Sequence, residues 1–180
     1  MKLFIEILFL LFLSVLTANE NKFAFNEMEN KLNFTLGDLT FDQKDEFTQV
    51  TSKGYGTIAL DGFPDLPIFT TFYQLPQGKS IDVNFTITEF QIFENIEIET
   101  YNLEKENQTR EKYISDSNFP IEHIMVSNPI RMRDIQFVKI SLIPFNYNSE
   151  NSTLEIFEQV EFEITEVDDP NYIENQLSKP

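Results

Sequence analysis

The chain has 180 residues, of which 41% are hydrophobic, with 19 phenylalanines, no cysteine and a formal net charge of −17. This composition supports one folded domain and excludes a disordered acidic tail. Without cysteine, a thiol nucleophile and a thiolate zinc site are excluded for this chain, and the negative charge disfavours nucleic acid, which binds proteins chiefly through Lys and Arg.

The N-terminus is expected to be a signal peptide. An apolar run from Leu3 to Val15 follows Lys2 and precedes the small residues Thr17 and Ala18. This pattern predicts cleavage after Ala18 and a mature chain that is secreted or held at the cell surface, by way of the periplasm. Because Glu6 interrupts the run, an uncleaved anchor is the alternative, but the run is shorter than the roughly 20 apolar residues that cross a bilayer. After cleavage no membrane contact is expected.

Alternation of apolar and polar residues dominates the rest of the chain and predicts strands with one buried face. In the clearest run Ile81, Val83, Phe85 and Ile87 share one face. Shorter alternating runs predict further strands at 32–36, 96–99, 138–142 and 160–165. Such strands, separated by turns, predict an all-β fold, either an antiparallel β-sandwich or an open, barrel-like sheet.

Turn residues separate these runs, at Gly54–Gly56, Pro76–Gly78, Asn118–Pro120 and Asn146–Ser152. The strongly polar stretch 102–117 is expected to be an exposed loop with at most one helical turn. We therefore divide the chain into a signal peptide at 1–18, a β domain at 19–165 and an acidic linker at 166–180.

No catalytic residue is predicted. His123 is the only histidine, so a catalytic triad would have to include it, but its neighbours indicate the start of a strand and a structural or surface histidine. No cofactor or metal is expected. Calcium ligands are conceivable at the Asp61 and Asp65 turn or at Asp168 and Asp169, but no Asp-x-Asp-x-Asp-Gly pattern occurs and solvated turn carboxylates are favoured.

Two arginines near Pro129 form a small basic group. Arg131 and Arg133 alternate in sequence, which predicts that both lie on one strand face as ion-pair partners of the acidic surface.

Short motifs spread along the chain resemble those of gingipain-type propeptides. The run from Asp61 to Pro67 and then Leu75–Gly78 are similar to that family's Gly-x-Pro-x-Leu-Pro and Leu-Pro-x-Gly stretch. Phe119–Pro120 and the run from Ile140 to Asn148 resemble its late Pro-x-x-Tyr-Asn region, so the resemblance spans roughly residues 36–165. The matching residues, which we expect to be structural, are Gly62, Pro64, Leu66, Pro67, Pro76, Gly78, Pro120, Pro144 and Tyr147.

The resemblance implies a function in proteolysis. Members of this family are N-terminal prodomains of secreted bacterial cysteine endopeptidases, which assist folding and keep the zymogen latent. The chain itself would not be an enzyme, because it has no cysteine. Its implied partner is a gingipain-like catalytic domain, in cis or in trans. Loop position and charge then make Arg110 the candidate for filling the partner's specificity pocket, with Lys105 and Lys112 beside it.

Two other functions stay open at this point. An exported cell-surface module for adhesion, or for binding protein or glycan, would need the same β domain and no peptidase partner. A small extracellular hydrolase that uses paired carboxylates is compatible with 30 Asp and Glu, although the sequence singles out no pair.

Overall fold

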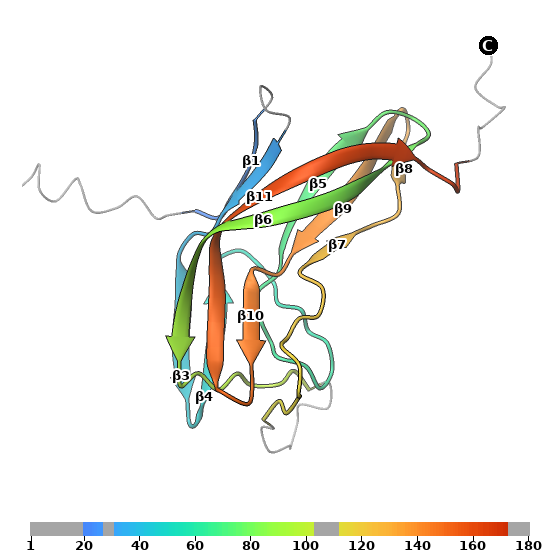
Figure 1. Cartoon of the computed structure of the whole chain (residues 1–180). Coiled ribbons are helices and arrows are strands. Elements are labelled where there is room, and N and C mark those ends of the chain that lie inside the picture. Colours follow the sequence, from blue (N-terminus) through green and yellow to red (C-terminus); the bar gives the residue numbers. More distant parts are fainter. Residues whose placement is uncertain (1–19, 27–30, 103–111, 173–180) are drawn as a thin grey trace, which may run out of the picture.

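The computed structural model describes residues 20–26, 31–102 and 112–172, and all regular secondary structure in these residues is β-strand (Figure 1). The predicted signal peptide lies outside the described residues. Within those ranges there is no helix with the length and hydropathy needed to cross a bilayer.

Most of the strands belong to two antiparallel sheets. The five-stranded sheet has the order β1-β2-β11-β10, and β6 pairs with β11. Its strands are β1 (Lys22–Asn26), β2 (Lys31–Thr35), β6 (Lys79–Glu94), β10 (Phe145–Asn148) and β11 (Thr153–Asp168). The four-stranded sheet has the order β5-β9-β7, and β8 pairs with β9. Its strands are β5 (Phe69–Leu75), β7 (Ile124–Val126), β8 (Ile130–Met132) and β9 (Ile135–Leu142).

The remaining strands form a hairpin, β3 (Leu39–Lys44) and β4 (Phe47–Ser52), and every pairing of named strands in the described residues is antiparallel. The prediction of an all-β antiparallel fold is therefore confirmed, and the described sheets do not close into a barrel.

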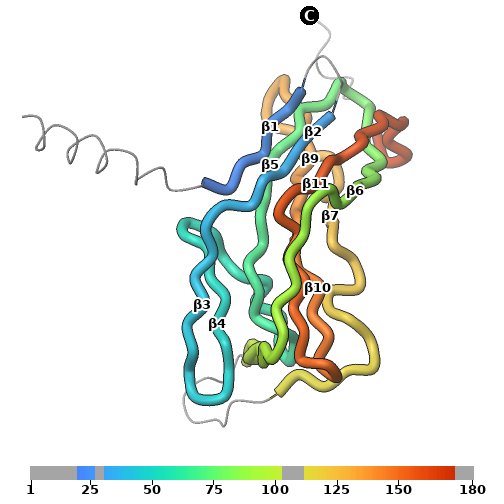
Figure 2. The backbone as a smooth tube through the Cα atoms, turned by 60° about the vertical axis from the view of Figure 1, so that its left-hand side comes forward, coloured from blue at the N-terminus to red at the C-terminus, as the bar shows by residue number. Residues whose placement is uncertain are grey.

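The long ribbon of β6 and β11 links the parts of the fold. The two strands pair along their whole length, with register shifts between Phe157 and Val160. Irregularities of this kind increase local bending of a strand pair. In Figures 1 and 2 the upper half of the ribbon runs alongside β5 and β9, and the lower half runs towards the same end of the molecule as the β3–β4 hairpin.

The core lies between these layers and is rich in aromatic rings. Phe34 of β2 contacts Phe69 of β5, with ring centroids 5.2 Å apart, and both side chains are buried. Leu32, Val138 and Phe162 are buried as well, as inward positions of alternating strands must be. The predicted face of Ile81 to Ile87 is confirmed for three of its four residues, because Ile81 is buried and Val83 and Ile87 are half-buried. Phe85 differs, since its side chain is 36% exposed.

Four sequence expectations differ from the structure. The stretch 96–99 makes only isolated bridges. The Glu97 carbonyl accepts the Thr48 amide of β4, and the Ile98 amide donates to the Tyr147 hydroxyl, so no continuous ladder forms with a neighbouring strand. Residues 146–148 belong to β10, since Phe145 and Tyr147 alternate inward. β11 continues to Asp168, three residues into the expected linker, because β6 pairs with it that far. Finally, Arg131 lies in β8, whereas Arg133 is in the following turn with a φ of 57°.

His123 is a half-buried structural histidine, which is one of the two alternatives that the sequence left open. Its ring lies 5.0 Å from that of Phe157 and 6.0 Å from that of Phe85. Its Nδ1 donates to the Ile143 carbonyl at 3.2 Å, and the Ile143 amide donates back to the His123 carbonyl at 2.9 Å. Burial lowers the pKa of His123 below its usual 6.5, and this outweighs the opposing effects of nearby carbonyls and Glu155.

This lowered pKa predicts a loss of stability in mild acid. The fold favours the neutral ring, so the stabilisation is present above pH 6.5 and falls as the pH drops through 6.5 towards the folded-state pKa. We expect the free energy of unfolding, measured with urea, to fall less for His123→Phe than for wild type between pH 7.5 and 5.5. The Phe ring keeps the ring contacts but does not titrate. Parallel losses in the two proteins would show that another group titrates.

Candidate functional site

The candidate inhibitory segment, residues 103–111, contains two of the three predicted basic residues. Arg110 and Lys105 lie outside the described residues, whereas Lys112 is described. The residues that flank the segment are held at the end of the molecule where β10 turns into β11. We call this anchoring group the segment base and define it as Glu97, Glu99, Lys112, Tyr113, Tyr147 and Ser152.

Lys112 fastens the C-terminal side of the segment to the strand-like stretch before it. Its backbone forms an antiparallel bridge with Glu99. Its ammonium donates to Glu97 Oε1 at 2.7 Å. In this arrangement the charge of Lys112 is directed at Glu97, within the domain.

Glu97 accepts hydrogen bonds from three side chains. Ser152 Oγ donates at 2.5 Å and the Tyr147 hydroxyl at 3.4 Å, in addition to Lys112. Burial acts to raise the pKa of Glu97, but the bonds from Lys112 and Ser152 and the charge of Lys112 outweigh it and lower that pKa. Glu97 is therefore an ionised acceptor that joins the segment base to the β10–β11 turn.

Tyr147 connects the base to the core. Its side chain is fully buried, and its hydroxyl oxygen accepts the Ile98 amide at 3.3 Å while its hydrogen is directed at Glu97. Burial raises the pKa of Tyr147 to about 12. The phenol therefore stays protonated and can donate at any physiological pH.

The family-like motif braces the N-terminal side of the segment. The Gly62 amide donates to the Tyr101 carbonyl at 2.8 Å, and the Tyr101 amide donates to the Phe63 carbonyl at 2.8 Å. Pro64 forms a bridge with Thr100. Gly62 has a φ of 79°, a conformation that glycine adopts without steric cost. These residues fix the backbone immediately before the candidate segment.

Aromatic packing holds the C-terminal side. Tyr113 lies 5.8 Å from Phe119 and 6.4 Å from Tyr147, measured between ring centroids. The backbones of Phe119 and Tyr147 exchange two hydrogen bonds of 2.8 Å. The Ser115 amide also donates to Ser149 Oγ at 3.2 Å. Residues 112–119 are thus fastened to β10, and both ends of the candidate segment start from fixed positions.

The other motif residues lie elsewhere in the domain. Leu66, Pro67, Pro120 and Pro144 are buried, and the Pro144 carbonyl accepts the Phe157 amide at 2.9 Å. Pro76 and Gly78 form the turn between β5 and β6, where the Pro76 carbonyl accepts the Lys79 amide at 3.3 Å. The motif residues therefore divide between the end of the molecule that carries the segment base, the core and the opposite end of the ribbon.

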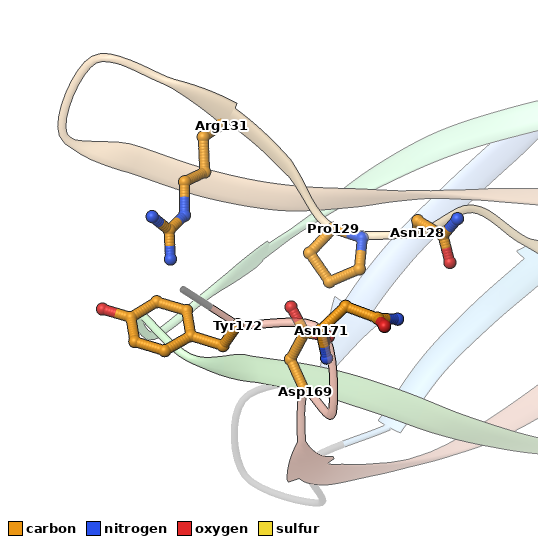
Figure 3. Close-up of a pocket in the computed structure, with 6 residues that line it drawn as sticks. All are labelled: Asn128, Pro129, Arg131, Asp169, Asn171 and Tyr172. Carbon is orange, nitrogen blue, oxygen red and sulfur yellow. Dashed lines mark hydrogen bonds between the residues drawn. The ribbon is translucent and has the colours of Figure 1, made fainter. Parts of the chain in front are cut away.

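At that opposite end, the stretch after β11 packs against the domain. The ring of Tyr172 lies against Gly78, and the Arg131 guanidinium lies 4.3 Å from the ring centroid of Tyr172 (Figure 3). The Asp169 amide donates to the Gly78 carbonyl at 2.9 Å. An open pocket of about 440 Å³ is lined by Asn128, Pro129, Arg131, Asp169, Asn171 and Tyr172. The chain is thus held as far as Tyr172.

The carboxylates considered for calcium are not gathered into a cluster. Asp168 pairs with Lys79 at 2.7 Å. Asp61 is exposed, whereas one carboxylate oxygen of Asp65 is buried without a hydrogen bond, so this turn is not wholly solvated. Within residues 20–26, 31–102 and 112–172, no three His, Asp or Glu side chains are placed to hold a metal.

Sequence reasoning did not identify Glu97, Tyr113 or Ser152. Glu97 looked like the outward residue of an alternating strand, and Ser152 like a turn residue. The one signal in the sequence for a role of Glu97 was its position between Ile96 and Ile98, a few residues before the polar stretch 102–117. That signal does not show that the carboxylate points towards β10.

One family model matches this chain, and two solved structures share its fold. The model of the family Propeptide_C25 matches residues 14–177. A chain from the complex of Porphyromonas gingivalis RgpB pro- and mature domains is similar at 20% identity and a TM-score of 0.70, covering 87% of this chain and 89% of that chain. A structure of gingipain K from the same organism, which concerns zymogenic latency, is similar at 13% identity and a TM-score of 0.58, covering 84% and 95%. Comparison with curated protein sequences gave no significant match.

Proposed function

The chain belongs to the Propeptide_C25 family, and on that basis we propose that it is a secreted prodomain that assists folding of a gingipain-like cysteine endopeptidase and keeps it latent. The observation that carries the proposal is the family match over residues 14–177. It favours the prodomain over a surface adhesion module or a carboxylate hydrolase. The chain has no cysteine, so the peptidase activity would reside in a catalytic domain.

We propose that domain, in cis or in trans, as the partner. The similar RgpB structure is a complex of pro- and mature domains, which supports a direct contact. In this chain the contact would centre on residues 103–111, with Arg110 in the specificity pocket as a basic, product-like side chain. Because the segment base fixes both ends of that segment, less conformational entropy would be lost when the peptidase binds.

Lys112 would have a different role from Arg110. Its ammonium is bound to Glu97 at 2.7 Å, so entering a peptidase pocket would cost it that ion pair. We therefore assign Lys112 to holding the segment base and leave pocket filling to Arg110, with Lys105 as the second candidate.

The experiment is an inhibition titration. Residues 19–180 are added to a gingipain-type peptidase from the same organism, and hydrolysis of Arg and Lys ester substrates is followed. Saturable inhibition by the folded chain, absent with the heat-denatured chain, is expected. No inhibition and no binding at micromolar concentration would refute the latency function and restore the surface-module alternative.

A further inference from the structure

The outer edge of β6 is an unusually long free strand edge. β6 has 16 residues, about three times the usual strand length, and in the part of the chain that the structure describes it pairs only with β11. A free edge presents unpaired backbone donors and acceptors, which natural proteins usually protect with Pro, Lys or a covering element. Between Ser80 and Glu94 there is no Pro or Lys.

Two large apolar side chains are exposed on the lower half of this strand. Phe90 is 55% exposed and Ile92 is 59% exposed. They lie on one face of the strand, opposite Phe157 and Glu155 of β11. Exposed apolar side chains beside a free edge provide both pairing and burial for an added strand.

This part of β6 leads directly into the segment base. After Glu94, the Ile96 amide donates to the Ser152 carbonyl at 2.9 Å, and Glu97 follows. A peptidase that contacts the segment base would therefore be close to the lower half of β6. The exposed acidic residue Glu94 lies on the same face as the apolar pair, so the surface favours a partner segment that carries Lys or Arg. Glu89 lies on the other face, where its carboxylate accepts a hydrogen bond from Gln159.

We propose that residues 89–94 of β6 receive an extended, apolar and basic segment of the peptidase, which adds as a strand to the five-stranded sheet and covers Phe90 and Ile92. This inference rests on the proposed prodomain function. It adds a second contact, separate from pocket filling, that would contribute affinity without blocking the active site.

The test compares Phe90→Lys and Ile92→Lys with Phe72→Lys in the inhibition titration. Phe72 is a matched control because it is 64% exposed and lies on β5 of the other sheet. We expect the inhibition constant to rise at least tenfold for each β6 variant and less than twofold for Phe72→Lys, with unchanged thermal unfolding. Hydrogen exchange of the complex should show slowed amide exchange in residues 89–94.

Three results would overturn the inference. If wild type inhibits and the β6 variants match Phe72→Lys, the edge is not a contact, although the prodomain function stands. If wild type dimerises and Phe90→Lys makes it monomeric without weakening inhibition, the edge binds a second copy. If wild type does not bind the peptidase at all, both proposals fail together.

Discussion

Replacing Arg110 with alanine is expected to weaken inhibition of the gingipain-like peptidase by about 100-fold, equivalent to about 2.7 kcal/mol. A pocket-filling arginine is buried against the partner and its guanidinium makes charge-assisted hydrogen bonds, so truncation leaves the pocket's polar groups unpaired. The measurement is the inhibition constant in the same ester-hydrolysis titration.

The neighbouring lysine provides the matched control for Arg110. Lys105→Ala removes one positive charge from the same segment and should change the inhibition constant less than threefold if the role of Arg110 is specific. Arg110→Lys keeps the positive charge but loses the planar guanidinium with its paired N–H donors. Against an Arg-selective peptidase its inhibition constant should lie between those of wild type and Arg110→Ala. An unchanged inhibition constant for Arg110→Ala would reject the pocket assignment.

The second large effect is expected at Tyr147. Tyr147→Ala should destabilise the domain by about 3–5 kcal/mol, the usual cost of deleting a buried aromatic side chain. The side chain is fully buried, and its ring packs against Tyr113 while its hydroxyl joins Ile98 to Glu97. Urea unfolding followed by circular dichroism measures the change.

A conservative variant separates the ring from the hydroxyl. Tyr147→Phe keeps the packing but leaves the Ile98 amide without its acceptor, which costs about 1–3 kcal/mol when a buried donor is unsatisfied. We also expect weaker inhibition, because the segment base loses one of its links to the core. A Tyr147→Phe protein as stable as wild type would show that the hydroxyl bonds do not hold the base.

The two ends of the β6–β11 ribbon constrain how a peptidase can bind. The segment base lies at one end of β11, and the Tyr172 contacts lie at the other. A strand of 16 residues spans roughly 50 Å when straight. Because the ribbon bends near its register shifts, its two ends are closer together than this length, and the exposed β6 edge runs between them (Figure 1).

The sequence alone determined the fold class and the positions of β2, β9 and parts of β6 and β11, whereas β1, β3, β4, β5, β8 and β10 were not predicted. Ile81, Val83 and Ile87 alternate with polar residues, and a period of two is sufficient to place these three side chains inward without knowledge of the partner strand. The exposure of Phe85 on the same face was not predictable from the period. The short motifs around Gly62 and Tyr147 were also sufficient to indicate the family, since they occur in a fixed order along the chain.

Only the tertiary structure decided the segment base and the course of the long strands. Glu97 is 50 residues from Tyr147 and 55 residues from Ser152 in sequence, and the hydrogen bonds that it accepts from them depend on β10 and its following turn lying beside residues 97–100. The same holds for the register shifts near Gln159 and the free edge of β6, because pairing is a property of two segments together. The local sequence pattern indicates which residues prefer burial, but it does not indicate which distant residues they will contact.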